Sequence, residues 1–266
     1  MPSYAITGAS RGIGYGFVTA LSKIPGNTVF ALVRNKAATE KKLADEGINN
    51  VQVVVADLTD AAGLDAAAAV VAKSTGGSLD FLINNAAALP MDQWPLDQYP
   101  HNELDKIFGE CFTGNVNGVA HTINAFLPLI RQGQAKKVIT ISSSMADIYF
   151  VNDYDLSINV AYSVSKAAAN ALVAQYNALL GKKEGILFLS LSPGAVDTAA
   201  GRPPLTEKET ASFMELAVKL QGYAPDFKGP ISVEESVEKQ LKVIHEATVQ
   251  TSGGAFVSHS GNKRWL

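Results

Sequence analysis

The chain has 266 residues, of which 47% are hydrophobic and 18% charged, a composition typical of a globular protein rather than a disordered one. Its formal net charge of −3 at pH 7 provides no electrostatic basis for binding nucleic acid or an anionic membrane, so we expect small-molecule partners. No apolar run approaches the roughly 20 residues that span a bilayer.

The numbers and positions of the cysteine and the histidines limit which disulfide bonds and metal sites are possible. The single cysteine, Cys111, excludes an internal disulfide, and the first residues pass into an apolar strand without the pattern of a secretion signal. We therefore expect a cytoplasmic protein. The four histidines lack metal-ligand spacing with one another or with Cys111, so no metal site is predicted.

Short apolar runs alternate with segments long enough for helices, the pattern of repeated strand–helix–strand units. This alternation predicts an α/β fold, with one Rossmann-type, doubly wound parallel sheet, helices on both faces, and a single domain over residues 1–266. Strands are expected at 4–7, 28–33, 51–56, 79–84, 137–141, 186–191 and 254–258, and helices at 12–24, 61–73, 102–130, 162–180 and 234–247.

Two segments interrupt the alternation. Residues 90–100 contain three prolines together with Trp94 and Tyr99, which predicts an irregular excursion. Residues 199–229 place prolines and glycines around an amphipathic piece, and we expect this segment to form a lid over the substrate.

A tyrosine and a lysine, Tyr162 and Lys166, lie four residues apart in a run of good helix formers, so they share a helix face. A positive charge within roughly 4–6 Å favours a phenolate, which predicts a tyrosine able to exchange a proton near neutral pH. An exposed pair on an amphipathic helix is the alternative interpretation. The motifs elsewhere in the chain favour the first interpretation, a tyrosine that exchanges a proton.

The first predicted strand runs into a glycine-rich turn, Thr7-Gly-Ala-Ser-Arg-Gly-Ile-Gly14, followed by a helix. Gly8, Gly12 and Gly14 would let main-chain amides approach a pyrophosphate at the helix N-terminus. Glycines also serve tight turns without a ligand, but the strand–turn–helix context favours a dinucleotide. The turn lacks the Lys-Ser/Thr ending of a nucleotide-hydrolysing loop.

Cofactor choice is predicted by the residue about 20 positions beyond the glycines, where an arginine accommodates the 2′-phosphate of NADP. Position 34, which is 14 + 20, is Arg34, and Arg11 in the glycine turn could reach the same phosphate. A solvated arginine at a strand end is the alternative. We favour the interpretation that these arginines bind the 2′-phosphate, which predicts NADPH as the cofactor.

Taken together, these motifs resemble the short-chain dehydrogenase/reductase family nearly from end to end. The motifs that carry the resemblance are the glycine-rich turn, Asp57-Leu58, Asn84-Asn-Ala-Ala87, Asn115-Val116, Ser142-Ser-Ser144, Tyr162-Ser-Val-Ser-Lys166 and Pro193-Gly-Ala-Val-Asp-Thr198.

The resemblance implies site residues. Four match the family's catalytic set: Asn115, Ser143, Tyr162 and Lys166. Ser143 is chosen as the second serine after the strand, and Ser144 stays open. The residues expected to bind the cofactor are Gly8, Ser10, Arg11, Gly12, Ile13, Gly14, Arg34, Asp57, Leu58, Asn85, Ala86, Tyr162, Lys166, Val196 and Thr198.

Within the family the chain resembles fungal ketoreductases of the norsolorinic acid type, through Arg34-Asn35, the segment 251–259 and Trp265. It departs from the family in having Ala87 where glycine is usual. It also has a longer gap between serine and tyrosine, 162 − 143 = 19 residues, which enlarges one wall of the site.

The resemblance implies an NADPH-dependent ketoreductase in which Tyr162 donates the proton, Ser143 stabilises the developing oxyanion, Lys166 holds the nicotinamide ribose and Asn115 fixes a water. We expect a bulky aromatic or polycyclic ketone of secondary metabolism as substrate. Its pocket is expected to gather Trp94, Tyr99, Ile148, Tyr149, Phe150, Tyr154, Phe213 and Met214.

Alternatives are a non-catalytic NADPH-binding sensor and an NAD(P)-dependent alcohol dehydrogenase working in the oxidative direction. We also expect a homodimer or homotetramer. A small-residue face comprising Ala167, Ala168, Ala171 and Ala174 could pack against a partner helix, although core packing explains these alanines equally well.

Overall fold

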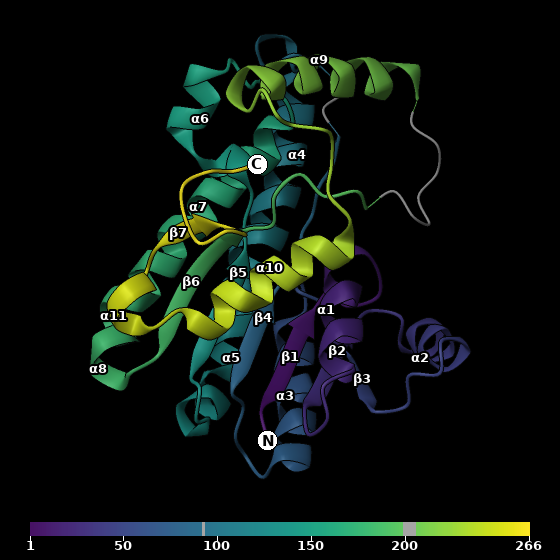
Figure 1. Cartoon of the computed structure of the whole chain (residues 1–266), viewed down its shortest axis with the longest axis vertical. Coiled ribbons are helices and arrows are strands. Elements are labelled where there is room, and N and C mark those ends of the chain that lie inside the picture. The colour runs from purple at the N-terminus through teal and green to yellow at the C-terminus, as the bar shows by residue number, and fades with distance from the viewer. Residues whose placement is uncertain (92–93, 199–205) are drawn as a thin grey trace.

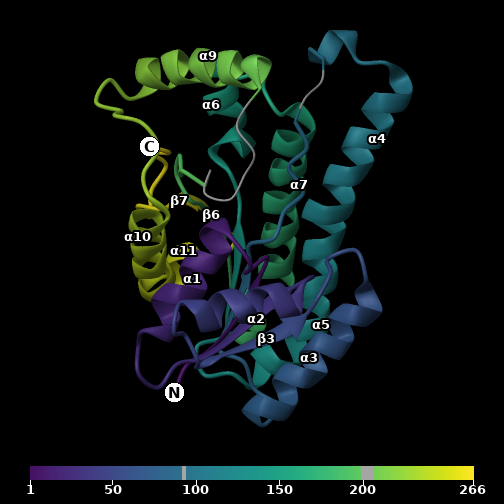
Figure 2. The ribbon, with the colours of Figure 1, turned by 90° about the vertical axis from the view of Figure 1, so that its right-hand side faces the viewer.

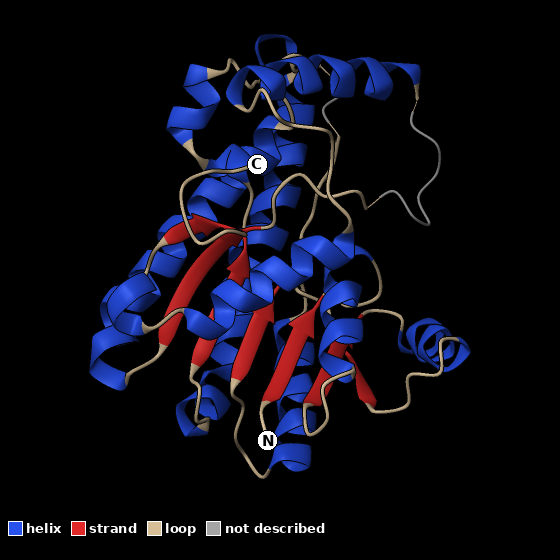
Figure 3. Cartoon of the chain, in the orientation of Figure 1, coloured by secondary structure: helices blue, strands red, loops and turns tan. Residues whose placement is uncertain are grey.

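The computed structural model describes residues 1–91, 94–198 and 206–266, with side chains left out at 207–209 and 211–213. Its centre is a seven-stranded parallel sheet in the order β3-β2-β1-β4-β5-β6-β7, shown in red in Figure 3. The expected α/β fold is therefore confirmed. The strands are β1 (Ser3–Thr7), β2 (Thr28–Val33), β3 (Val51–Val55), β4 (Phe81–Asn84), β5 (Lys137–Ile141), β6 (Leu187–Ser192) and β7 (Phe256–Ser258).

Helices flank both faces of this sheet (Figures 1 and 2). They are α1 (Gly12–Ser22), α2 (Lys36–Asp45), α3 (Ala61–Thr75), α4 (His101–Phe112), α5 (Gly118–Gln132), α6 (Ile148–Asp153), α7 (Val160–Tyr176), α8 (Lys182–Glu184), α9 (Glu207–Tyr223), α10 (Val233–Glu246) and α11 (Val249–Ser252). In the part of the chain that the structure describes, none of these helices is long and apolar enough to cross a membrane.

The core forms two layers because consecutive strand residues point to opposite faces. On β1, Ile6 packs into the layer beneath α1 and α10, whereas Ala5 packs into the layer beneath α3, α5 and α7. Both side chains are fully buried. We propose that residues 1–266 form one domain, since the described strands all join this sheet.

The strand order reverses beside β1, which pairs with β2 on one side and with β4 on the other. In an open parallel sheet, such a reversal leaves a crevice at the carboxyl ends of the strands, where ligands bind. The segments that follow β1 and β4 therefore lie at the place where a dinucleotide is expected.

The helix expected at 102–130 is interrupted. A π-helical segment at Thr113–Asn117 separates α4 from α5. A Cβ atom on Gly118 would lie 2.7 Å from the Leu58 Cβ, so the chain passes too close to the β3–α3 connection for a side chain there. The helical periodicity of the sequence does not reveal this contact between distant segments.

The segment expected to form a lid is helical over much of its length as α9, and residues 199–205 lie outside the described residues. In Figures 1 and 2, α9 lies across the end of the molecule to which the strands point, above α6. The expected excursion at 90–100 contains one short 3₁₀ turn, Leu96–Gln98, before α4 begins.

Candidate active site

The predicted cofactor residues outside the helices share one structural property: each follows a strand, and parallel strands end at the same edge of the sheet. The glycine turn follows β1, Arg34 follows β2, Asp57 and Leu58 follow β3, Asn85 and Ala86 follow β4, and Val196 and Thr198 follow β6. Ser143 follows β5 at the same edge. The topology thus brings together residues that are up to 190 positions apart in the chain.

The glycine turn adopts the conformation that its composition favours. Gly8 and Gly12 have φ values of 66° and 55°, in the left-handed region that other residues avoid. A Cβ atom on Gly8 would lie 2.8 Å from the Ala86 Cα, so the turn packs directly against the end of β4. Helix α1 starts at Gly12, and no side chain caps it at Arg11. Its first amides are therefore free to face a phosphate.

Asn85 ties the end of β4 to this turn. Its side-chain Nδ2 donates to the Thr7 carbonyl oxygen at 2.9 Å, and the main-chain amides of Asn85 and Ala86 both donate to Thr7 Oγ1 at 3.0 Å. Thr7 is a residue whose role the sequence reasoning missed, because its partners lie 78 and 79 positions away. Its hydroxyl holds the two halves of the crevice together.

The corner expected to hold the 2′-phosphate contains two exposed cations, Arg11 and Arg34. Asp57 lies near Arg34. The main-chain amide and hydroxyl of Thr59 donate to Asp57 Oδ1, and these hydrogen bonds, with a smaller effect of Arg34, lower the pKa of the Asp57 carboxyl. Asn35 caps α2 by accepting from the Ala38 amide at 3.0 Å, so this residue has a structural function.

The loop after β6 returns to the glycine turn. A Cβ atom on Gly12 would lie 3.6 Å from the Thr198 Cγ2, which places Thr198 beside the start of α1. Val196 pairs with Ile231 in an isolated parallel bridge, and the Ile231 amide donates to the Ala195 oxygen at 2.8 Å. This bridge closes the base of the excursion that carries α9.

Ser143 and Tyr162 are joined by a side-chain hydrogen bond. Ser143 precedes the 3₁₀ turn Ser144–Ala146, and its Oγ also accepts from the Met145 amide at 3.3 Å. Ser144 begins that turn instead. The geometry therefore favours Ser143 as the serine that works with Tyr162.

Lys166 is almost completely buried, with 2% of its surface exposed. Its Nζ donates to the Ile141 carbonyl oxygen at 2.7 Å and lies 5.6 Å from the centroid of the Tyr162 ring. Burial lowers the pKa of Lys166 to about 8. It also raises the pKa of Tyr162 to about 12, although the hydrogen bond with Ser143 acts in the opposite direction.

These shifts correct the expectation that Lys166 brings the phenol of Tyr162 close to neutrality. The helical spacing does place the two residues on one face of α7, but desolvation disfavours the charged form of each group. Burial outweighs the attraction that spacing alone suggested. At neutral pH the phenol is protonated.

Asn115 is fully buried in the π-helical segment, and its side chain is committed to protein partners. Oδ1 accepts from the Ala88 amide at 2.7 Å, while Nδ2 donates to the Ala88 oxygen and to Ser165 Oγ, both at 2.9 Å. Ser165 in turn donates to the Tyr162 carbonyl oxygen at 2.7 Å. Asn115 thus positions the start of α7, and the water that we expected it to hold stays a prediction.

Cys111 on α4 is a neighbour that the sequence reasoning did not place here. It is fully buried with Ile107 and Ala161 in a small cluster that also contacts Tyr162. A negative charge on this thiol would raise the pKa of both Tyr162 and Lys166. No signal in the sequence could have found this contact, because α4 and α7 meet only in the folded chain.

A comparison with known families shows which family the chain belongs to. Residues 3–209 match the family model described as short chain dehydrogenase. The chain belongs to the short-chain dehydrogenase/reductase family. It is therefore an oxidoreductase.

Relatives of this oxidoreductase include fungal proteins. It is 51% identical to the short-chain dehydrogenase/reductase AacuF of Aspergillus aculeatus over 100% of both chains. It is 28% identical to the norsolorinic acid ketoreductase nor1 of Dothistroma septosporum, over 98% of this chain and 91% of that protein. The expected resemblance to this type of ketoreductase is confirmed.

A solved structure supports the same assignment. The chain superimposes on the NADPH-bound carbonyl reductase from chicken fatty liver with a TM-score of 0.77 and 29% identity, covering 98% of each chain. Within the described ranges, the chain has no group of three or more His, Cys, Asp or Glu side chains that could hold a metal ion.

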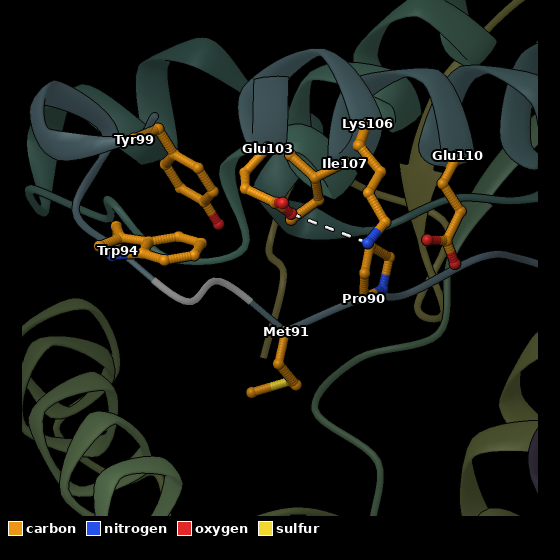
Figure 4. A pocket seen from close by; sticks show the side chains of 8 residues that line it. All are labelled: Pro90, Met91, Trp94, Tyr99, Glu103, Lys106, Ile107 and Glu110. Atoms are coloured by element: carbon orange, nitrogen blue, oxygen red, sulfur yellow. Dashed lines mark ion pairs between the residues drawn. The ribbon is translucent and has the colours of Figure 1, made fainter. Parts of the chain in front are cut away.

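A pocket of about 210 Å³ lies between the loop after β4 and helix α4 (Figure 4). Trp94 and Tyr99 meet edge to face in it, with ring centroids 5.3 Å apart. Ile107 connects this pocket to the cluster around Tyr162. The full lining is Pro90, Met91, Trp94, Tyr99, Glu103, Lys106, Ile107 and Glu110.

The other side chains expected around the substrate do not share this pocket. Phe150 is buried beside Tyr154 in a separate cluster, whereas Ile148, Tyr149 and Met214 are exposed by 64%, 74% and 67%. Phe213 lies outside the described side chains. Of the eight expected residues, Trp94 and Tyr99 line this pocket, and the expectation that the others face the same substrate stays a prediction.

Proposed function

We propose that this protein is an NADPH-dependent ketoreductase that transfers hydride to the carbonyl carbon of a bulky aromatic or polycyclic ketone. The observation that carries the proposal is the hydrogen bond between Ser143 and Tyr162, beside buried Lys166 at the carboxyl edge of the sheet. The likeness to a norsolorinic acid ketoreductase supports the choice of substrate class.

The residues present fit the cofactor. Gly8 leaves no room for a side chain at the point where β1 meets the end of β4, as a turn that cradles a pyrophosphate requires. The uncapped start of α1 offers amides to the phosphates. Exposed Arg11 and Arg34 suit the additional 2′-phosphate of NADPH, since a guanidinium binds phosphate with two parallel hydrogen bonds.

When bound, NADPH would supply the hydride. Tyr162 would donate its proton to the carbonyl oxygen, and the Ser143 hydroxyl would donate a hydrogen bond to that oxygen as negative charge develops. A pKa of about 12 keeps the proton on Tyr162 at neutral pH, which suits an acid in reduction better than a base in alcohol oxidation. Lys166 would stabilise the phenolate that is left.

The setting of the reaction is also proposed. We place the enzyme in the cytoplasm, acting on a small-molecule ketone or alcohol as a homodimer or homotetramer. Val164 and Ala171 are exposed on one face of α7, with Val164 exposed by 42%. An exposed apolar face on this helix supports packing against a second copy.

A substrate series at fixed NADPH concentration tests the proposed function. We expect kcat/KM to rise from acetone-sized ketones to fused-ring aromatic ketones, because burial of apolar area contributes about 25 cal/mol per Å². The Tyr162→Phe variant serves as the blank for non-enzymatic reduction. A kcat/KM that is highest for small aliphatic ketones would exclude the proposed substrate class.

A further inference from the structure

An aromatic cluster, here called the cap cluster, joins three segments that are distant in the chain: the region of α6, the end of α9, and residues 256–266. Its buried members are Phe150, Leu156, Leu220 and Trp265. Packed against them are Met145, Val151, Tyr154, Leu216, Tyr223, Phe227, Phe256 and Leu266.

Tyr223, at the end of α9, lies at the centre of this cluster. Its ring centroid is 4.8 Å from that of Phe150 and 5.2 Å from that of Tyr154, both nearly perpendicular. Its hydroxyl accepts a hydrogen bond from the main-chain amide of Trp265 at 2.9 Å. Tyr223 therefore contacts both α6 and the segment that follows β7.

Trp265 connects the cap cluster to the sheet. Its side chain is 2% exposed and stacks on Phe256 of β7 with ring centroids 4.5 Å apart. Lys263 lies over both rings, at 5.0 Å and 5.4 Å from their centroids. Strand β7 pairs with β6 through Ser258 and Ser192, so Trp265 is held by a rigid element.

Helix α9 depends on these contacts. Among its described side chains only Leu220 is buried, while Met214 and Val218 are exposed by 67% and 68%. In the described part of the helix, Leu216 and Tyr223 also attach it through the cap cluster, and Lys219 donates a hydrogen bond to the Asp155 oxygen. Among the described side chains, the contacts that attach α9 thus lie towards its C-terminal end.

The cap cluster also adjoins the site. The excursion that carries α9 leaves after Thr198 and returns at Ile231, which pairs with Val196. Met145 belongs to the cluster, and its amide donates to Ser143 Oγ. A ligand that reaches from Ser143 beneath α9 would therefore meet a wall whose position the cluster sets.

We infer that Trp265 and Tyr223 are positioning residues that hold α9 over the substrate and thereby determine the preference for large ketones. The inference rests on the proposed function, in which a ketone binds beside Ser143, and it adds that α9 covers this ketone. The inference requires that a fused-ring ketone reach α9 and that an acetone-sized ketone fall short of it. Loosening α9 therefore weakens the binding of large ketones selectively.

The experiment compares Trp265→Ala, Trp265→Phe and Tyr223→Phe with the wild type. For Trp265→Ala we expect KM for a fused-ring aromatic ketone to rise about tenfold, the effect of losing one good apolar contact. We expect kcat to change less than about threefold, and the NADPH Kd and the kcat/KM for a small ketone to stay within the same factor. Trp265→Phe should restore most of the lost affinity.

Tyr223→Phe keeps the ring and removes only the acceptor for the Trp265 amide, so it tests the inference even where Trp265→Ala folds poorly. Like Trp265→Ala, it should raise the KM for the large ketone, in this case by roughly threefold. The matched control is Leu64→Ala on α3, a fully buried side chain in the core layer beneath α3, α5 and α7. It should lower Tm without changing the ratio of large-ketone to small-ketone kcat/KM.

Two outcomes overturn the inference. One of them leaves the proposed function intact, and the other excludes it as well. If Tyr223→Phe and Trp265→Ala change kcat/KM for large and small ketones by the same factor, the cap cluster does not determine substrate size, and the proposed function stands. If the wild type reduces no ketone with NADPH, the proposed function fails and the inference fails with it.

Discussion

The Lys166 Nζ lies 5.6 Å from the centroid of the Tyr162 ring while it donates to the main-chain oxygen of Ile141 at 2.7 Å. Burial acts on the two groups in opposite directions, raising the pKa of Tyr162 to about 12 and lowering that of Lys166 to about 8. At neutral pH the phenol keeps its proton and most of the lysine is still cationic. This combination of an acid and a neighbouring cation suits the proposed reduction of a carbonyl group.

The first prediction concerns the acid. Tyr162→Phe should abolish ketone reduction while NADPH still binds, because the ring and its packing survive and only the proton donor is lost. Fluorescence titration of NADPH beside a turnover assay measures both properties. Turnover that persists in the variant would show that Tyr162 is not the acid.

The second prediction separates two neighbouring serines. Ser143→Ala should lower kcat by about a hundredfold or more, the usual effect of removing a donor to a developing oxyanion. Ser144→Ala is the matched control and should stay within a few-fold of wild type. The reverse ranking would reassign the catalytic serine.

The third prediction concerns stability and pH. Between the lowered pKa of Lys166, about 8, and its ordinary value of 10.5, the unfolded chain binds a proton that the folded chain does not, so wild-type stability rises with pH. Lys166→Met lacks this dependence. Its stability relative to wild type should therefore be most favourable near pH 7 and decline as the pH rises through 8, by roughly 3 kcal/mol over the whole window.

Denaturant unfolding between pH 7 and pH 10 measures this difference. Above that range the raised pKa of Tyr162 acts with the opposite sign, because the folded chain then binds the extra proton. Loss of the hydrogen bond to Ile141 adds an offset that does not depend on pH. Parallel stability curves for the two proteins would contradict a depressed pKa at Lys166.

The fourth prediction concerns the cofactor. Arg34→Asp should weaken NADPH binding about ten- to a hundredfold and affect NADH less, since charge-assisted hydrogen bonds contribute roughly 1.5–3 kcal/mol each. Lys36→Asp is the matched control, an equal charge change at an exposed site paired with Glu40 at 3.6 Å. The measurement is kcat/KM with NADPH and with NADH for the wild type and both variants. An unchanged NADPH/NADH ratio in Arg34→Asp, or an equal change in both variants, would refute contact with the 2′-phosphate.

What the sequence determined is local in origin. The seven-stranded parallel sheet follows from apolar runs of strand length alternating with helices, and the turn at Gly8 and Gly12 follows from φ values that only glycine adopts readily. The shared face of Tyr162 and Lys166 follows from helical spacing. Each of these properties depends on residues close together in the chain, so composition and periodicity suffice to predict it.

The tertiary structure decided what depends on contacts between distant segments. The interruption of the long helix at Asn115 comes with its hydrogen bonds to Ala88 and Ser165, and Trp265 meets Tyr223 42 positions away. The directions of the pKa shifts at Tyr162 and Lys166 are set by burial, since desolvation depends on everything packed around a group. A local sequence pattern does not predict this buried environment, because the environment forms only when helices and strands from the whole chain come together.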